Sequence, residues 1–222
     1  MTGGINEERG EAFYKDWYKT GGWKYSIWKE FWWHRRHVVK RFGLKRGGRM
    51  LEIACGGGFH TNLFNRMGFD CVGVDRSEAG IEWARSHYPK RRFHVCDFRN
   101  MPFKPASFDV VLARGFSFYH YDLTSAEALG ATSTLIRYLK PGGVFIMIIV
   151  TDLSGKREAD QIWHNTLEDY RLHFSSFARK WSVGWINGAA VCGLFNEPSS
   201  CISSFRDRCI LGGESATVSP AR

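Results

Sequence analysis

The sequence lacks any hydrophobic run long enough to cross a bilayer as a helix, which takes about 20 apolar residues. Its longest apolar run, Val144 to Val150, has the length of a buried strand. Residues 1–10 are polar and contain no apolar core of the kind found in signal peptides. These absences argue against a membrane protein and predict a cytoplasmic protein that does not bind membranes.

Cysteine pairs at metal-binding spacing are also absent. None of the six cysteines forms a Cys-x-x-Cys pair. Three of them occur in apolar, strand-like runs, where a small buried thiol is ordinary. The other three, Cys192, Cys201 and Cys209, are spaced too widely for a typical zinc site. We therefore expect no metal site.

Prolines are few, six in 222 residues, and none of them forms a linker between domains. From residue 48 apolar strand-like runs alternate with helical patterns, which predicts an α/β fold with a doubly wound, mostly parallel sheet. Strands are expected at 49–54, 70–75, 92–96, 108–113 and 143–150, and helices at 59–67, 77–87, 124–139 and 156–180. Beyond 180 the pattern weakens: 181–195 suggests one or two strands, and 203–211 another.

The front segment, residues 1–44, is rich in aromatic residues and contains five of the nine tryptophans. Gly21 and Gly22 divide its helix-prone part, and the apolar residues on each side follow helical spacing. Packing on the sheet explains most of these residues, but so many tryptophans favour a helical lid over an apolar or aromatic ligand. Residues 45–211 are then the main domain, and 212–222 a disordered tail.

The net charge of +9 is compatible with an anionic partner such as RNA. The positive residues gather in two places, around His34–Arg46 and at Lys90–Arg92. No recognisable RNA-binding module accompanies them, so a solvated surface is the preferred interpretation. Nucleic acid remains a less favoured alternative to a small-molecule partner.

Four strands of the predicted sheet end in charged residues at the same edge. Ligands of open parallel sheets bind at this edge, where the carboxyl ends of the strands lie. The first strand ends in Glu52 and a glycine loop, the second in Asp75, and the third in Asp97. The fourth ends in Arg114 and opens into a loop. Asp75 stands at a distance from the loop typical of a carboxylate that binds ribose hydroxyls. Asp97 can accept from an exocyclic amine.

This ordered set resembles the class I S-adenosylmethionine-dependent methyltransferases, in particular the small-molecule methyltransferases. The acidic residue and glycines of the family's first motif read Glu52-Ile-Ala-Cys-Gly-Gly-Gly58, with Ala54 where the first glycine is usual. Leu139-Lys-Pro-Gly-Gly143 matches the turn before the fifth strand. The aromatic residues from Phe13 to Tyr18 resemble the lid ahead of the core. The resemblance covers about residues 45–150.

The resemblance implies S-adenosyl-L-methionine as cofactor and S-adenosyl-L-homocysteine as product. Gly56 and Gly58 would let backbone approach the amino-acid part of the cofactor, Asp75 would bind the ribose, and Asp97 the adenine amine. The full set of implied cofactor-binding residues is Glu52, Ala54, Gly56, Gly58, Asp75, Arg76, Asp97, Phe98, Arg114 and Gly115. Arg76 and Phe98 would flank the adenine, and Arg114 and Gly115 would line the sulfonium.

The methyl acceptor is less defined by the sequence. A base is needed only if the acceptor keeps its proton at neutral pH. Our candidate is His120, beside Tyr119 on the loop after the fourth strand, and Tyr14 is a second catalytic candidate. Tyr18 and Tyr25 are further candidates for binding the acceptor, with Tyr119 and His120.

Several enzyme classes are disfavoured. The fourth strand ends in Ala113-Arg-Gly-Phe116 and lacks the Asn/Asp-Pro-Pro-aromatic signature that amino-methylating DNA enzymes share. No cysteine stands where a cytosine carbon-5 methyltransferase needs one, and the carboxylates do not make a catechol-type metal site. Methyl transfer to oxygen or nitrogen of a small, anionic or aromatic molecule remains. The alternatives are an RNA methyltransferase and a non-catalytic cofactor-binding protein. A nicotinamide-dependent dehydrogenase would need a glycine where Thr61 stands.

Overall fold

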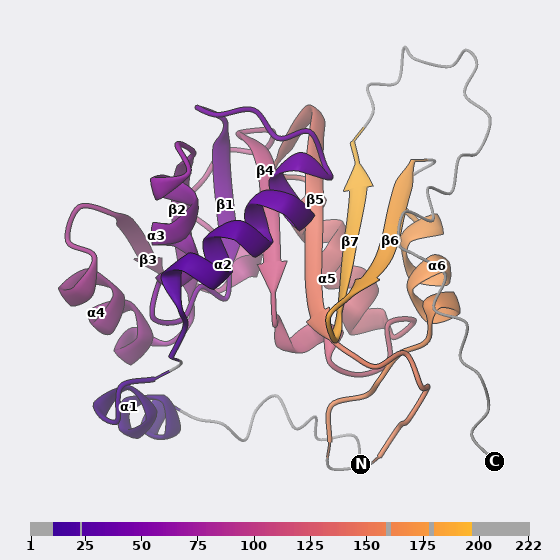
Figure 1. Ribbon diagram of the computed structural model, residues 1–222, viewed down its shortest axis with the longest axis horizontal. Helices are drawn as coiled ribbons and strands as arrows, with labels where there is room; N and C mark the ends of the chain where they lie inside the picture. Colours follow the sequence, from indigo (N-terminus) through magenta and orange to yellow (C-terminus); the bar gives the residue numbers. More distant parts are fainter. Residues whose placement is uncertain (1–10, 23, 159–160, 178–179, 197–222) are drawn as a thin grey trace.

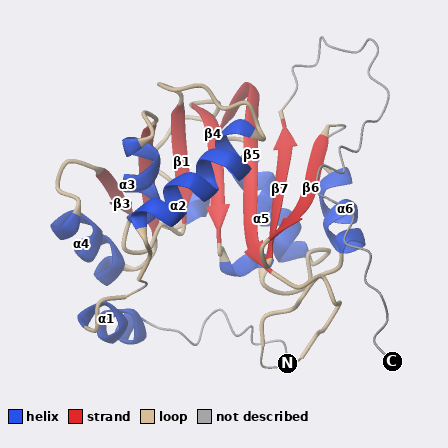
Figure 2. Ribbon diagram, in the orientation of Figure 1, coloured by secondary structure: helices blue, strands red, loops and turns tan. Residues whose placement is uncertain are grey.

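A computed structural model describes residues 11–22, 24–158, 161–177 and 180–196. Seven strands form one sheet in the order β3-β2-β1-β4-β5-β7-β6, with β1 to β5 parallel and β7 antiparallel to both β5 and β6 (Figures 1 and 2). The strands are β1 (Arg49–Ile53), β2 (Asp70–Asp75), β3 (Arg92–Val95), β4 (Phe108–Arg114), β5 (Leu139–Val150), β6 (Trp181–Ile186) and β7 (Ala189–Phe195). The predicted doubly wound, mostly parallel sheet is confirmed.

Helices cover both faces of the sheet, because its central strands are apolar on both sides. One face carries α2 (Ile27–His34), η1 (Arg35–Lys40, a π-helix) and α3 (Phe59–Arg66). Val38, Leu63 and Phe64 from these elements pack there against Met50 of β1 and Ile146 of β5. Figure 1 shows α2 crossing the middle of the sheet on this side.

The opposite face carries α5 (Ala126–Ile136) and α6 (Leu167–Ser175). Leu135, Tyr170 and Phe174 from these helices are buried against Leu51 of β1 and Phe145 of β5. Neighbouring residues of β1 therefore enter different cores, as the alternation of side chains along a strand requires. The remaining helices are α1 (Glu11–Lys19), α4 (Glu78–His87), η2 (Phe98–Asn100) and η3 (Ser117–Tyr119).

The front segment forms two separate helical pieces, as predicted. Gly21 and Gly22 both have positive φ, 96° and 58°, and follow the end of α1. Such angles are favourable for glycine and costly for other residues, so the chain turns there before α2 begins. α1 packs against α4 at the side of the sheet, where the rings of Tyr18 and Trp83 lie 5.9 Å apart.

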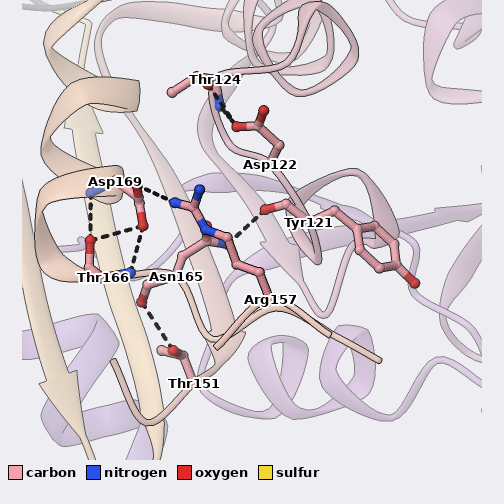
Figure 3. Close-up of polar contacts among 8 residues, drawn as sticks. All are labelled: Tyr121, Asp122, Thr124, Thr151, Arg157, Asn165, Thr166 and Asp169. Atoms are coloured by element: carbon pink, nitrogen blue, oxygen red, sulfur yellow. Dashed lines mark hydrogen bonds and ion pairs between the residues drawn. The ribbon is translucent and has the colours of Figure 1, made fainter. Parts of the chain in front are cut away.

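The predicted helix at 156–180 is wrong over its first part, because α6 begins only at Leu167. Thr166 caps this helix: its hydroxyl accepts from the Asp169 amide, and Asp169 accepts from the Thr166 amide. The preceding chain folds back on itself, with the His164 amide donating to the Lys156 carbonyl. Asn165 anchors it by donating to the Tyr121 carbonyl at 2.7 Å (Figure 3). These long-range bonds override the local helical preference.

The weak pattern after residue 180 does contain strands, since β6 and β7 form a hairpin through Asn187 and Gly188. β7 pairs with β5 along its whole length. The strand predicted at 203–211 and the tail at 212–222 lie outside the described residues. Among the helices of the described residues, none is both long and apolar enough to cross a membrane.

Candidate active site

β1 ends in a buried carboxylate and a loop with unusual backbone angles. Glu52 is 2% exposed, and its carboxylate accepts a hydrogen bond from the Thr61 hydroxyl of α3. Burial raises the pKa of Glu52 to about 7, although the Thr61 bond and the charge of Arg114 act in the opposite direction. Gly56 and Gly58 both have positive φ, and so does Ala54, at 55°. The Gly58 position also leaves no space for a side chain, because a Cβ there would lie 2.5 Å from Phe93.

Asp75, at the end of β2, ties this loop to the sheet. One of its oxygens accepts from the Gly56 amide at 2.8 Å, and the other from the Ser77 amide at 2.9 Å. Burial raises the pKa of Asp75, and these two bonds counteract the rise. A carboxylate has about four acceptor positions, so Asp75 can hold the loop and also accept from a hydroxyl of a ligand.

The predicted adenine-binding residues follow at the ends of β2 and β3. Asp97 precedes η2 and is held by Arg99, whose side chain donates to both carboxylate oxygens at 2.8 and 2.7 Å. This pairing holds the pKa of Asp97 below its usual value. Phe98 is 9% exposed and packs edge-on against Phe116. Arg76 lies exposed beside Asp75.

Tyr18 of α1 lies directly on the glycine loop. It is 6% exposed, and a Cβ at Gly56 would come within 2.6 Å of its hydroxyl oxygen. A Cβ at Gly57 would come within 2.9 Å of its ring. Burial and the nearby Asp75 carboxylate raise the pKa of Tyr18. Tyr14, one turn earlier in α1, is partly buried. The front segment thus reaches the loop, as a lid would.

On the other side of the loop, Arg114 ends β4 and meets the second half of the front segment. It donates to the Tyr25 hydroxyl at 3.2 Å, and its guanidinium lies 5.2 Å from the centre of the Tyr25 ring. It also lies 3.9 Å from the Glu30 carboxylate. Gly115 follows with φ of 62° and open space at its Cβ position. The structure therefore brings Tyr25, Arg114 and Gly115 to the same sheet edge as Glu52 and Asp75.

Beside Arg114 lies a polar cluster that the sequence analysis did not single out: Glu30 and His34 of α2 with His60 of α3. His60 Nε2 lies 3.2 Å and His34 Nδ1 3.4 Å from the same Glu30 oxygen. His34 is fully buried and His60 is 6% exposed. The signal available in the sequence was the i, i+4 spacing of Glu30 and His34, which places both on one helix face.

The two candidates after β4 have different surroundings. Tyr119 is fully buried, and its hydroxyl bonds to the Thr132 hydroxyl at 2.8 Å. Thr132 in turn lies 2.9 Å from His173 Nε2, so Tyr119 belongs to a network inside the core. His120 is partly exposed at the end of η3, and its carbonyl accepts from the Trp163 amide at 2.8 Å. Tyr119 thus joins α5 and α6, whereas His120 is partly exposed in the loop after β4.

The comparisons with known proteins concern the same half of the chain. A family described as "Methyltransferase domain" matches residues 51–147, from the middle of β1 into β5. A protein of Mycolicibacterium smegmatis named "Probable S-adenosylmethionine-dependent methyltransferase" is 31% identical over 122 residues, which are 54% of this chain and 46% of that protein. The sterol 24-C-methyltransferase erg6 of Schizosaccharomyces pombe is 31% identical over 119 residues, 50% of this chain and 30% of that protein.

The chain thus spans about half or less of the length of these relatives. Among solved structures, a phosphoethanolamine N-methyltransferase of Haemonchus contortus superposes with a TM-score of 0.59 and 22% identity. The matched part is 81% of this chain and 44% of the Haemonchus contortus chain, whose structure contains S-adenosylhomocysteine. The matched segment holds the acidic strand ends and the glycine loop described above. The match to the methyltransferase domain and the similarity to these relatives support the resemblance to the class I S-adenosylmethionine-dependent methyltransferases, and the solved structure shares the fold.

Proposed function

We propose that this chain transfers the methyl group of S-adenosylmethionine to an oxygen or nitrogen of a small, anionic or aromatic molecule. The observation that carries the proposal is the sheet edge where Glu52, the glycine loop and Asp75 meet inside the matched methyltransferase domain. The sulfonium and the amine of the cofactor are cationic, so carboxylates near them are favourable.

The reaction depends more on aligning the acceptor with the methyl group than on acid or base groups of the protein. The methyl carbon is attacked in line by a lone pair of the acceptor, and the sulfur leaves as a neutral thioether. The protein must hold both molecules in this geometry and exclude water. Tyr18, which lies on the glycine loop, supports a role for α1 in closing the site over the cofactor.

The acceptor class rests on Arg114 and Tyr25. Arg114 is 27% exposed at its side chain, carries a positive charge, and stacks over an aromatic ring at the edge where the cofactor loop ends. Such a pair suits an acceptor with a carboxylate, a phosphate or an aromatic ring. Similarity alone does not select the acceptor atom, since the relatives above are named for carbon and nitrogen methylation.

Calorimetry with S-adenosylhomocysteine tests the cofactor part of the proposal, and we expect binding with one site per chain. Methyl transfer from labelled S-adenosylmethionine to a panel of small acids, phenols and amines tests the acceptor. A folded sample that gives no heat with S-adenosylhomocysteine contradicts the first part, and labelling of neutral aliphatic compounds alone contradicts the second.

His120 is our candidate for the base, with Tyr14 as the second catalytic group. His120→Ala should lower kcat at neutral pH and leave the affinity for S-adenosylhomocysteine unchanged, because the side chain would act only on the acceptor proton. The exposed His87→Gln serves as a control that should change neither. Unchanged turnover in His120→Ala removes this residue from the mechanism.

An RNA acceptor is the second candidate, and α2 provides the observation that favours it. Trp28 and Trp32 are 71% and 58% exposed, and the Arg35 guanidinium lies 5.3 Å from the Trp32 ring centre. Exposed aromatic rings beside cations suit unstacked bases. RNA binding should then weaken steeply with salt and be lost in Trp28→Ala/Trp32→Ala. Labelling of small acceptors but not of RNA would reject this candidate.

A further inference from the structure

The cluster of Glu30, His34 and His60 joins the front segment to the helix that follows the glycine loop. We propose that these three side chains form a binding site for a divalent transition metal ion, for which zinc fits best. One ligand atom from each residue lies within 4.8 Å of the other two. The cluster lies beside Arg114 and shares no residue with Glu52 and Asp75, the carboxylates that we assign to the methyl donor.

The distances match those of a metal site. With metal–ligand bonds of about 2.0–2.1 Å, two ligands of a tetrahedral zinc ion stand roughly 3.3 Å apart. Here His60 Nε2 lies 3.2 Å and His34 Nδ1 3.4 Å from one Glu30 oxygen. Three side chains in this arrangement need little movement to take up a common ion.

The chemistry of the three groups selects the kind of ion. Two imidazoles and one carboxylate suit zinc and its neighbours in the first transition row, whereas calcium and magnesium require mainly oxygen ligands. His34 and His60 are both buried, and burial favours the neutral form of each imidazole. A neutral imidazole has the lone pair that a metal binds.

The His34 ring also has hydrogen-bonding capacity that the described residues do not use. Its Nδ1 lies 2.9 Å from the Glu30 carbonyl oxygen, but its fully buried Nε2 has no hydrogen-bond partner among the described residues. A metal ion bound at Nδ1, the nitrogen near the Glu30 carboxylate, would replace the bond to the Glu30 carbonyl, and the ring proton would move to Nε2 without a change in charge.

Arg114 sets the affinity of this site, because its guanidinium lies 3.9 Å from the Glu30 carboxylate and repels a second cation. Removing the charge with Arg114→Gln should therefore tighten metal binding. A cluster held together only by hydrogen bonds would not respond in this way.

Metal titration of the 222-residue chain tests the proposal without any methyl donor or acceptor. After chelator treatment and dialysis, we expect calorimetry to show one zinc ion per chain, and cobalt to give the strong visible absorption of a tetrahedral complex. Glu30→Gln, His34→Gln and His60→Gln should each weaken zinc binding by about 100-fold or more, beyond the 10–100-fold typical of losing an outer-shell partner.

The exposed His87→Gln is the matched control and should bind zinc like the wild type. Cys201→Ser/Cys209→Ser excludes the thiols as ligands and should also keep the ion. If a cluster variant fails to fold, the cobalt spectrum of the wild type still shows whether a tetrahedral metal complex forms. No stoichiometric zinc, a cobalt spectrum without tetrahedral bands, or full binding in the three cluster variants would overturn the site. The S-adenosylhomocysteine titration is a separate measurement, so either proposal can fail alone.

Discussion

At the ends of β1 and β2, the carboxylates of Glu52 and Asp75 bond to α3 and to the glycine loop. In the loop after β4, by contrast, the hydroxyl of Tyr119 bonds inside the core and joins α5 and α6. Both regions belong to the same sheet edge. Position at a strand end thus predicts the sheet edge at which a side chain lies. Position in a loop does not, because tertiary packing decides which loop residues are buried.

The largest effect that follows from this comparison concerns Glu52. Its pKa of about 7 in the folded chain lies above the usual 4.5, so between these two pH values the folded state holds a proton that the unfolded state has lost. Stability should therefore fall as pH rises from about 4.5 to about 7, by about 3 kcal/mol, and show no further contribution above 7. Denaturant unfolding across this pH range measures it.

Glu52→Gln should remove this part of the pH dependence, while the exposed Glu82→Gln should retain it. Equal slopes in all three proteins would show that the strand end of β1 is not tuned by burial.

Asp75 provides the second test, since it bonds the glycine loop while Asp97 at the next strand end bonds Arg99. Asp75→Ala should weaken S-adenosylhomocysteine binding by about 1–3 kcal/mol, through loss of the ribose contacts and of the Gly56 anchor. Asp97→Ala should cost less, because only one contact to the adenine amine is lost. Calorimetry measures both.

If Asp97→Ala proves the more damaging change, the roles assigned to the two strand ends must be exchanged. Unchanged affinity in Asp75→Ala would contradict the cofactor assignment itself.

Tyr119 tests the other side of the comparison. Tyr119→Phe removes the bond to Thr132 inside the core and should lower the free energy of unfolding by about 1 kcal/mol. Because the side chain is fully buried, the KM for the acceptor should stay unchanged. A changed KM with unchanged stability would place Tyr119 at the acceptor after all, as the sequence analysis expected.

The contrast between strand ends and loops also explains which parts of the structure could be predicted from the sequence. The first five strands and the acidic strand ends were predictable, because alternating apolar patterns are local and parallel strands align their carboxyl ends. The start of α6 was not, since Asn165 is held by the distant Tyr121 carbonyl. The burial of Tyr119 depends on Thr132 and His173, which lie far from it in the sequence.

The Glu30–His34–His60 cluster could not be predicted from the sequence for a related reason. The cysteine spacing and the carboxylates of the sequence indicate no metal site, and His60 alone is no metal motif. Nothing local indicates that α2 crosses the sheet and brings Glu30 within 3.2 Å of His60. The spacing of Glu30 and His34 on one helix was visible, but its partner came from another element.

The smallest expected effect is at Ala54. It tests whether the left-handed backbone of the glycine loop favours glycine at this position. Alanine stands at position 54, where the family's first glycine is usual, and φ there is 55°. A left-handed conformation costs a non-glycine residue about 1–2 kcal/mol, and glycine avoids this cost. Glycine also makes the unfolded chain more flexible, which destabilises the folded state by about 0.4–1 kcal/mol relative to alanine. Ala54→Gly should therefore stabilise the chain by about 0.5–1 kcal/mol in urea unfolding. Ala54→Val, which is bulkier and β-branched, should destabilise it. If glycine instead destabilised the chain, the alanine methyl group would have to contribute packing that outweighs the strained backbone, and the loop would be built by contacts of its side chains as well as by its backbone angles.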